Sequence, residues 1–377
     1  MNKRIDTIKG ILLIIILLVL VLPIIQEKFK FIHLRPLKGA IIEPQKEYFS
    51  LKTWFSGEYQ ENEEKYINET FGFRNLFIRI NNQIAFWMFN KAKANGVIIG
   101  KKNYLFEENY IKAYYGTDFV GVDSITTKIK KLKFIQDTLS KLNKNLIIVF
   151  AAGKGSYYPE YFPDKYKSNK GKTNYEYYVK LAQQYDLHFI DFNNYFCINK
   201  GISKYPLYPQ YGIHWSYYGA SFAADSIIKT IENLRNIKMP HIHWDNIRMD
   251  DAKDIDYDIG DGMNLLLPLK SFKMAYPELE FDFDSQNTKP SSIVISDSFY
   301  WIMFNFGISK VFSDSHFWFY NTQIYPDSYT SPLETSQVNL KEEINKHDVF
   351  IIMATEATLP KLGWGFIEKT YDLYTKN

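Results

Sequence analysis

The chain has 377 residues, 46% of them hydrophobic, which is enough to form a large folded core. Its formal net charge is only +3, and acidic residues interrupt the Lys and Arg residues, which argues against the basic face of a nucleic-acid-binding protein. The single cysteine, Cys197, excludes an intrachain disulfide and a multi-cysteine metal site.

An apolar run near the N-terminus predicts a membrane segment. Residues 11–25 carry no charge and follow the basic residues Lys3, Arg4 and Lys9. The run is short for a membrane span and has the length of a signal-peptide core, but no small-residue cleavage site follows it. We therefore predict that residues 1–27 form a cytoplasmic tip and an uncleaved single-pass anchor. Because basic residues stay on the cytoplasmic side, the rest of the chain is expected outside the cytoplasmic membrane.

The next segment, residues 28–94, is predicted to be a juxtamembrane stalk followed by helices. Its first part contains Pro36 and Pro44. From residue 48 onward, apolar residues recur at spacings of three and four, which is typical of helices.

From residue 95 to the C-terminus, strand-like and helix-like runs alternate. This alternation predicts an α/β domain with three layers and a mostly parallel sheet, because helices then connect parallel strands and cover both faces. Ligands of such sheets bind at the carboxyl ends of the strands. The predicted strands are 97–100, 104–107, 145–153, 187–192, 291–296 and 349–355, and the predicted helices are 122–143, 172–186, 217–235, 300–307 and 340–347.

Ser298 lies where a predicted strand gives way to a helix, in the stretch IVISDSFYW. A hydroxyl at such a turn is exposed at the sheet edge, and the N–H groups of the following helix can stabilise an oxyanion. The alternative is that Ser298 or Asp297 only caps the helix. From this triplet alone, both interpretations stay open.

His214 also precedes a predicted helix, which Ser216 is suited to cap. A neutral imidazole near pH 7 is a natural general base for a serine hydroxyl. The alternative is a histidine that packs beside Trp215. Because both loops are expected at the same edge of one sheet, together they favour a Ser–His pair.

The motifs SDSF (296–299) and IHWSYYGA (213–220) resemble the SGNH-hydrolase-like domain of the alginate O-acetyltransferase family. The stretches VIIGKKNYLFEE (97–108) and FGFRN (71–75), the N-terminal anchor and the order of the His loop before the Ser loop extend this resemblance. The resemblance implies an extracytoplasmic enzyme that acetylates a polysaccharide. It also implies a multispanning partner that passes acyl groups across the membrane.

The sequence departs from the family pattern beside the histidine. The family has Asp-any-His-Trp, and here Gly212 stands at the acid position; Ser296 also replaces a glycine in the Ser motif. Three alternatives remain, namely an acid from elsewhere, a Ser–His dyad oriented by a backbone carbonyl, or a domain that binds glycan without turnover. We place the dyad slightly ahead. The candidate acids in one unassigned stretch are Asp250, Asp251, Asp254, Asp256, Asp258 and Asp261.

Aromatic residues make up 17% of the chain, which suggests ring platforms for a sugar. We predict Trp215 and the loop residues Tyr157, Tyr158 and Tyr161 as substrate contacts. The stretch 254–265 fails the calcium-loop spacing, and the histidines at 241 and 243 do not complete a zinc site. We therefore predict neither metal nor cofactor.

The sequence thus predicts a membrane-anchored O-acetyltransferase that modifies a cell-surface or exported polysaccharide through an acyl-serine intermediate. Ser298 and His214 are the predicted catalytic residues, with Asp297 in a structural or oxyanion role. The alternatives are a glycan-binding or assembly subunit and a carbohydrate acetylesterase with the same Ser–His pair.

Overall fold

The computed structural model describes residues 2–39, 44–326 and 332–376. Of the predicted stalk, residues 40–43 lie outside this part, as do the side chains of Lys3 and Arg4. The chain forms two compact units, one of Met1–Asn95 with Gly260–Leu269, the other of Gly96–Ile259 with Lys270–Asn377.

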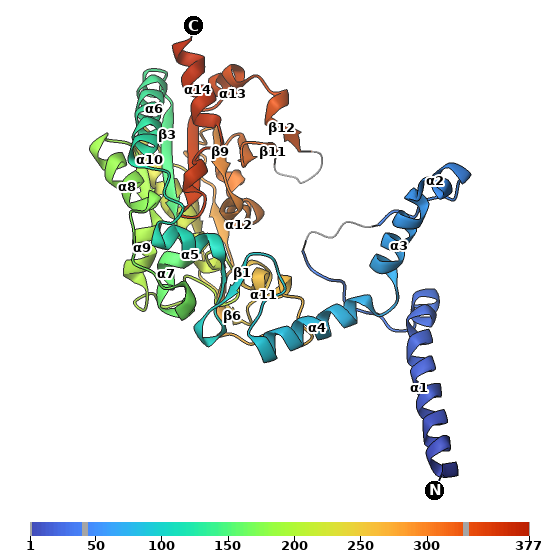
Figure 1. Cartoon of the computed structure of the whole chain (residues 1–377). Coiled ribbons are helices and arrows are strands. Elements are labelled where there is room, and N and C mark those ends of the chain that lie inside the picture. The colour runs from blue at the N-terminus through green and yellow to red at the C-terminus, as the bar shows by residue number, and fades with distance from the viewer. Residues whose placement is uncertain (1, 40–43, 327–331, 377) are drawn as a thin grey trace. The chain divides into compact units, whose positions relative to one another are not determined.

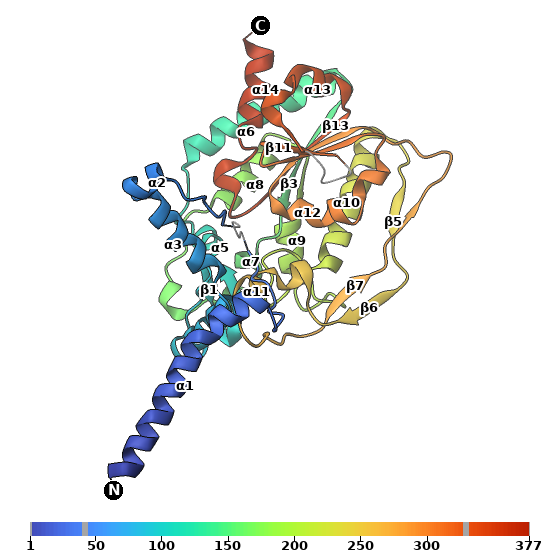
Figure 2. The same cartoon turned by 90° about the vertical axis from the view of Figure 1, so that its right-hand side faces the viewer.

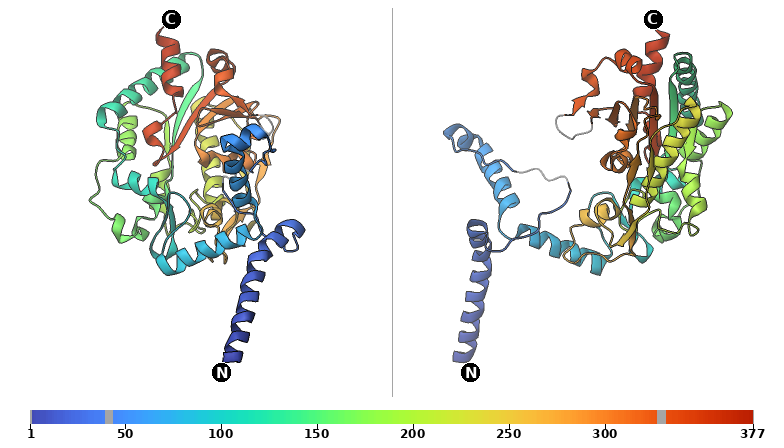
Figure 3. Two further views of the ribbon diagram at one scale, coloured as in Figure 1. Left: turned by 45° about the vertical axis from the view of Figure 1, so that its right-hand side comes forward. Right: turned by 180° about the vertical axis from the view of Figure 1, so that it is seen from behind.

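The first unit begins with one long helix, α1 (Asn2–Phe29), which contains Pro23 and bends near its C-terminal end (Figure 3). Within it, the 23-residue stretch Thr7–Phe29 has a mean hydropathy of 3.2 in its most apolar part, and no residue of that part is buried. By length and composition this helix is able to cross a membrane, which is compatible with the predicted single-pass anchor.

The predicted helical segment of the first unit is three helices: α2 (Leu51–Ser56), α3 (Glu58–Thr70) and α4 (Arg74–Phe89). Gly57 separates the first two because its φ of 85° lies in the left-handed region that ends helices. α4 holds the inserted segment 260–269 through polar side chains. The Arg79 guanidinium donates to the Leu265 carbonyl at 3.2 Å, and the Asn82 amide donates to the Met263 carbonyl at 3.0 Å.

Within the described residues, the second unit has a seven-stranded sheet of order β12-β11-β10-β9-β13-β3-β4. The strands from β10 to β4 pair in parallel, and β11 and β12 pair antiparallel at one edge, which confirms the predicted mostly parallel sheet. Their bounds are β3 (Asn145–Ala151), β4 (Phe189–Asp191), β9 (Ser292–Ser296), β10 (Ser315–Phe319), β11 (Gln323–Tyr325), β12 (Leu333–Glu334) and β13 (Val349–Thr355).

Helices cover both faces of this sheet, so the predicted three-layer α/β class is confirmed (Figure 2). Along β3, Leu146, Ile148 and Phe150 face one helical layer, and the alternate residues face the other, because side chains alternate along a strand. One layer holds α6 (Val122–Lys141), α8 (Asn174–Gln184), α13 (Leu340–Lys346) and α14 (Phe366–Thr375). The opposite layer holds α9 (Phe192–Asn199), α10 (Tyr217–Arg235) and α12 (Trp301–Asn305).

Smaller elements surround the sheet. Three antiparallel pairs join β1 (Val97–Ile99) to β2 (Leu105–Glu107), β5 (His241–His243) to β8 (Glu280–Asp282), and β6 (Ile247–Asp250) to β7 (Met274–Pro277). The remaining helices are α5 (Glu108–Tyr115), α7 (Lys154–Tyr157) and α11 (Asp258–Gly262).

The neighbouring parallel strands β9, β13 and β3 end at the same edge of the sheet (Figure 1). Their last residues are Ser296, Thr355 and Ala151, and the segments that follow them meet at this carboxyl edge. This is the edge at which α/β sheets bind ligands.

Candidate active site

Ser298 begins a short 3-10 turn directly after β9, and the preceding Asp297 fixes that turn. The buried Asp297 carboxylate accepts four hydrogen bonds, from the Phe299 N–H, from the N–H and hydroxyl of Thr355, and from the Thr358 hydroxyl. Asp297 therefore joins the end of β9 to the end of β13, and Ser298 is held half-buried at the edge.

The structure brings His214 and Ser298 together. The His214 Nε2 atom lies 2.9 Å from the Ser298 Oγ atom, although the two residues are 84 positions apart. Ser216 caps α10 by accepting from the Gly219 N–H, so the histidine is held on a loop that leads into a fixed helix. The His214 side chain is 16% exposed, so solvent reaches the pair.

An acid completes this arrangement, and it comes from Asp258. Its Oδ2 atom lies 2.6 Å from the His214 Nδ1 atom. Its Oδ1 atom accepts from the N–H groups of Ile213 and Ile259 at 2.9 and 2.6 Å, so the carboxylate is itself oriented. The favoured dyad, in which a backbone carbonyl orients His214, is therefore wrong. The first alternative, an acid from elsewhere, describes the structure.

Packing around Gly212 explains why the acid does not come from that position. A Cβ atom on Gly212 would overlap the Ile255 carbonyl oxygen and press against the backbone of Asp256. The stretch that leads to Asp258 thus occupies the space an aspartate side chain at position 212 would need. The glycine allows the close backbone approach that delivers the distant acid.

The environment of His214 favours its protonated form. Burial alone would lower the pKa of His214, but the carboxylate of Asp258, through its charge and its hydrogen bond, outweighs burial, and the net pKa is raised. Asp297 and Glu107 add smaller contributions in the same direction. Burial raises the pKa of Glu107 itself, and the Asp258 charge raises it further. The imidazole is therefore a stronger base than a free histidine.

Lys154 contacts the backbone of the His loop, although no sequence motif indicated it. Its fully buried amino group donates to the carbonyls of Gln210 and Gly212 at 2.9 and 2.5 Å. The group also lies over the Phe106 ring, 5.5 Å from the ring centroid. Burial lowers the pKa of Lys154 to about 7. This lysine fixes the backbone that precedes His214.

The predicted oxyanion donors need a correction. The N–H of Phe299 is bonded to the Asp297 carboxylate, and the N–H of Tyr300 points at the Asp297 carbonyl, so neither faces an incoming substrate. The Tyr320 oxygen lies against Ser298 and accepts hydrogen bonds from that residue's side chain and backbone. Burial raises the pKa of Tyr320, and hydrogen bonds with the side chain and backbone of Ser298 offset part of that rise.

The predicted sugar platforms are largely contradicted. Trp215 is fully buried and packs on Phe299, while Tyr157 and Tyr158 are 4% and 8% exposed, so none offers a ring face to a sugar. Only Tyr161 is partly exposed, and it stacks on Tyr104. The loop after β3 is therefore packed into the fold. Its glycines lie against the buried Glu356 carboxylate.

A cavity of about 490 Å³ adjoins the site through Tyr320. Its wall includes the rings of Tyr320 and Trp364, which lie 5.2 Å apart, and the polar side chains of Asn109, Lys112 and Thr358. Apolar ring faces next to polar groups are the kind of surface that binds a sugar.

Comparison with known proteins finds a matching family model. Residues 97–270 match the family model of the SGNH hydrolase-like domain of the acetyltransferase AlgX, which confirms the resemblance seen in the motifs. The matched range contains His214 and Asp258 and ends before Ser298. No curated protein sequence matches the chain at a significant level.

Three solved structures are similar to the chain. The O-acetyltransferase domain of Pseudomonas putida AlgJ is 15% identical and covers 74% of this chain and 99% of its own, with a TM-score of 0.47. Pseudomonas aeruginosa AlgX is 14% identical and covers 72% of this chain and 67% of its own, with a TM-score of 0.44. Bacillus cereus PatB1, solved with a sulfonyl adduct, is 10% identical and covers 72% and 99%, with a TM-score of 0.48.

Proposed function

We propose that this chain, whose residues 97–270 match an SGNH hydrolase-like acetyltransferase domain, is an O-acetyltransferase that modifies a polysaccharide through an acyl-serine intermediate. The observation that carries the proposal is the continuous series Asp258–His214–Ser298, with contacts of 2.6 and 2.9 Å. A carboxylate, an imidazole and a hydroxyl in this order form the arrangement used for acyl transfer.

In the first half-reaction, the Ser298 Oγ atom attacks the carbonyl carbon of an acyl donor while His214 Nε2 accepts the hydroxyl proton. The polar groups nearest the developing oxyanion are the Ser298 N–H, which in the resting site donates to the Tyr320 oxygen, and the Tyr320 hydroxyl. When the tetrahedral intermediate collapses, the imidazolium returns its proton to the leaving group, and an ester on Ser298 remains. Asp258 keeps the Nδ1–H tautomer and stabilises the imidazolium.

In the second half-reaction, a sugar hydroxyl enters from the cavity beside Tyr320 and Trp364. His214 removes its proton as it attacks the ester carbon, and the proton then passes to the Ser298 oxygen as that bond breaks. The acetyl group ends on the sugar, and the free serine is restored.

We further propose that α1 anchors the chain in the cytoplasmic membrane with the catalytic unit outside. Its apolar length supports an anchor, and the basic residues before it support a cytoplasmic N-terminus. Acyl-CoA is a cytoplasmic donor, so an acyl group has to be delivered across the membrane. A multispanning partner that passes acyl groups outward fits this need.

The deciding experiment replaces Ser298 by Ala in the full chain purified in detergent. Transfer of acetyl from a small acetyl ester to an oligosaccharide, and hydrolysis of that ester, are both expected to fall by about three orders of magnitude or more. The matched control is Ser296→Ala, which removes a nearby buried hydroxyl that has no hydrogen-bond partner and should keep activity. Unchanged activity of Ser298→Ala would rule out the acyl-serine intermediate.

A carbohydrate acetylesterase with the same residues is a second candidate, because the half-buried Ser298 is open to solvent. Water would then replace the sugar hydroxyl as acceptor. The ratio of transfer to hydrolysis at rising oligosaccharide concentration separates the two. Labelling of Ser298 by a sulfonyl fluoride would exclude a glycan-binding subunit without catalysis.

A further inference from the structure

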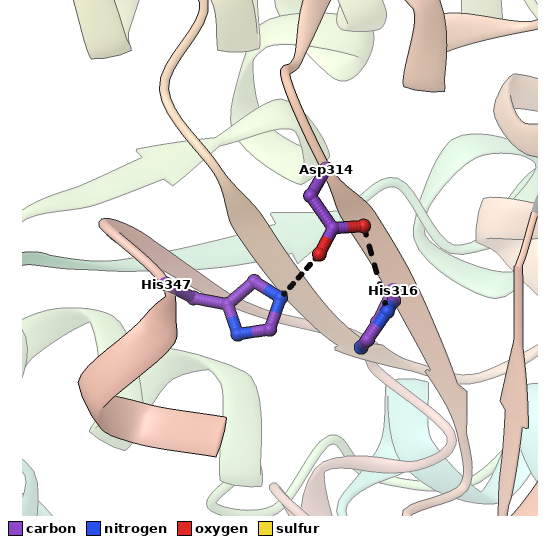
Figure 4. A group of neighbouring side chains, drawn as sticks. All are labelled: Asp314, His316 and His347. Atoms are coloured by element: carbon purple, nitrogen blue, oxygen red, sulfur yellow. Dashed lines mark ion pairs between the residues drawn. The ribbon is translucent and has the colours of Figure 1, made fainter. Parts of the chain in front are cut away.

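Two histidines and a carboxylate meet at the amino edge of the sheet, opposite the edge that carries Ser298. Figure 4 shows Asp314 directly before β10, His316 on that strand, and His347 at the junction between α13 and β13. One ligand-type atom from each residue lies within 4.8 Å of the others. The catalytic arrangement uses none of them.

The spacing in this cluster does not suit direct hydrogen bonds. The Nε2 atoms of His316 and His347 lie 3.5 and 3.6 Å from the two oxygens of Asp314. Hydrogen bonds between nitrogen and oxygen span about 2.7–3.2 Å. In a tetrahedral zinc site with bonds of about 2.1 Å, neighbouring ligand atoms lie about 3.4 Å apart. The observed distances, each to a different oxygen of Asp314, are close to such an edge, and one ligand atom from each of the three residues lies within 4.8 Å of the others.

A second layer of contacts orients both imidazoles toward Asp314. The Nδ1 atom of His347 contacts the Glu343 carbonyl oxygen at 2.8 Å, and the Nδ1 atom of His316 contacts the Glu343 carboxylate at 3.2 Å. An Nδ1–H that donates to an oxygen leaves the Nε2 lone pair free to bind a metal, and such backing is typical of metal-binding histidines.

The Nε2 atom of His347 gives independent evidence for a bound ion. The residue is fully buried, and its Nε2 atom has no hydrogen-bond partner while it points toward Asp314. A buried polar atom without a partner costs free energy, so such atoms are usually satisfied by protein, water or an ion. A cation between the three side chains would satisfy it.

We propose that Asp314, His316 and His347 bind one Zn²⁺ ion, with water in the fourth position. Two imidazoles and one carboxylate are a donor set that zinc favours over calcium or magnesium. The Asp314 side chain is 59% exposed, so the ion can enter from solvent. Because the ligands come from the start of β10 and the junction before β13, the ion ties these two strands together across β9 and stabilises the fold.

The test uses the full chain in detergent, purified without a histidine tag and stripped with a chelator. Titration with ZnCl₂ is expected to give one bound ion per chain and to raise Tm by several degrees, since a ligand of the native state stabilises it. Co²⁺ at the same site is expected to give visible absorption bands typical of a four-coordinate ion.

Two variants and one control make the result specific. Asp314→Asn and His316→Gln, both at solvent-reachable positions, should weaken Zn²⁺ binding about tenfold or more and remove the Tm shift. His243→Gln is the control, because His243 also faces two carboxylates, Glu280 and Asp282, but belongs to no three-residue ligand group among the described residues. The proposal fails if Zn²⁺ does not raise Tm, or if Asp314→Asn responds to Zn²⁺ as the unmodified chain does.

Discussion

The two edges of the sheet place the same residue types in different arrangements. At the carboxyl edge, His214 has a carboxylate behind it at Nδ1 and a hydroxyl in front of it at Nε2. At the amino edge, two histidines have Glu343 behind them and share Asp314 in front. We propose that the atom facing Nε2 distinguishes the two roles. A hydroxyl suits an imidazole that acts as a base, whereas a carboxylate at ligand spacing suits one that binds a cation.

Removal of the acid at the carboxyl edge gives the largest expected effect. Asp258→Asn keeps the shape of the side chain but no longer holds the Nδ1–H tautomer of His214. We expect kcat for acetyl-ester hydrolysis to fall by up to about four orders of magnitude. Asp256→Asn, two residues earlier and at a fully buried position, should leave turnover far less affected. Equal losses in the two variants would mean that Asp258 has no special role.

Gly212→Asp restores the family pattern and is nevertheless expected to reduce activity. Its side chain would overlap the backbone at Ile255 and displace the stretch that delivers Asp258. We expect at least a tenfold loss of kcat and a lower Tm, because overpacking costs about 1–3 kcal/mol. Gly262→Asp is the control, because that position has open space around it.

The double variant Gly212→Asp with Asp258→Asn gives a sharper form of this test. If the carboxylate at position 212 cannot reach His214, the kcat of the double variant stays as low as that of Asp258→Asn alone. Recovery of activity would show that an acid at position 212 can also orient His214. The packing around Gly212 would then not explain why the acid comes from Asp258.

Lys154→Met is expected to have an intermediate effect. It leaves the carbonyls of Gln210 and Gly212 without their buried donor, which costs about 1–3 kcal/mol. The His loop should then hold His214 less firmly, and kcat should fall about tenfold. Lys144→Met serves as control, since its amino group also donates to two carbonyls but at the amino edge. It should lower Tm without lowering kcat.

The pH profile is expected to shift by a smaller amount. His214 acts as a base only when neutral, and its pKa is raised above the ordinary value of 6.5. Activity should therefore fall as pH decreases through a midpoint above 6.5, measured as kcat/KM for a neutral ester. In Asp258→Asn, burial remains and the main opposing charge is gone, so the midpoint of the residual activity should move to lower pH. An unchanged midpoint would mean that a group other than His214 causes the loss of activity at low pH.

Much of this fold could be predicted from local sequence patterns, because helix caps and the spacing of apolar residues determine where its helices and strands lie. The predicted helix 217–235 is α10, since Ser216 caps its first turn and apolar residues recur along one side. The buried strand β13 was likewise visible as an apolar run. The strand β10 was not assigned, because SHFWF mixes polar and aromatic residues without a clear period. α14 was missed as well.

The site was harder to predict than the fold, because contacts between segments far apart in the sequence determine which residues belong to it. Ser298 and His214 follow recognisable strand and cap signals. Asp258 is one of six aspartates in one stretch, and only the contact between Ile255 and Gly212 selects it. Burial also decides which aromatic rings can meet a sugar, and composition does not reveal burial. The proposed zinc ligands were not identified for a similar reason, since His316 and His347 are far apart in sequence.

Exchange of the amino-edge ligands should have the smallest effect on turnover, which separates the two edges most directly. Asp314→Asn removes a proposed zinc ligand and leaves every contact of Ser298, His214 and Asp258 in place. We expect kcat within about twofold of the unmodified chain at 25 °C, with or without chelator, and a lower Tm only where Zn²⁺ was present. Measurement of kcat and Tm on the same samples tests this expectation. A large chelator-dependent loss of kcat well below Tm would mean that the ion acts on catalysis, and that the two edges are coupled through β9 and β13.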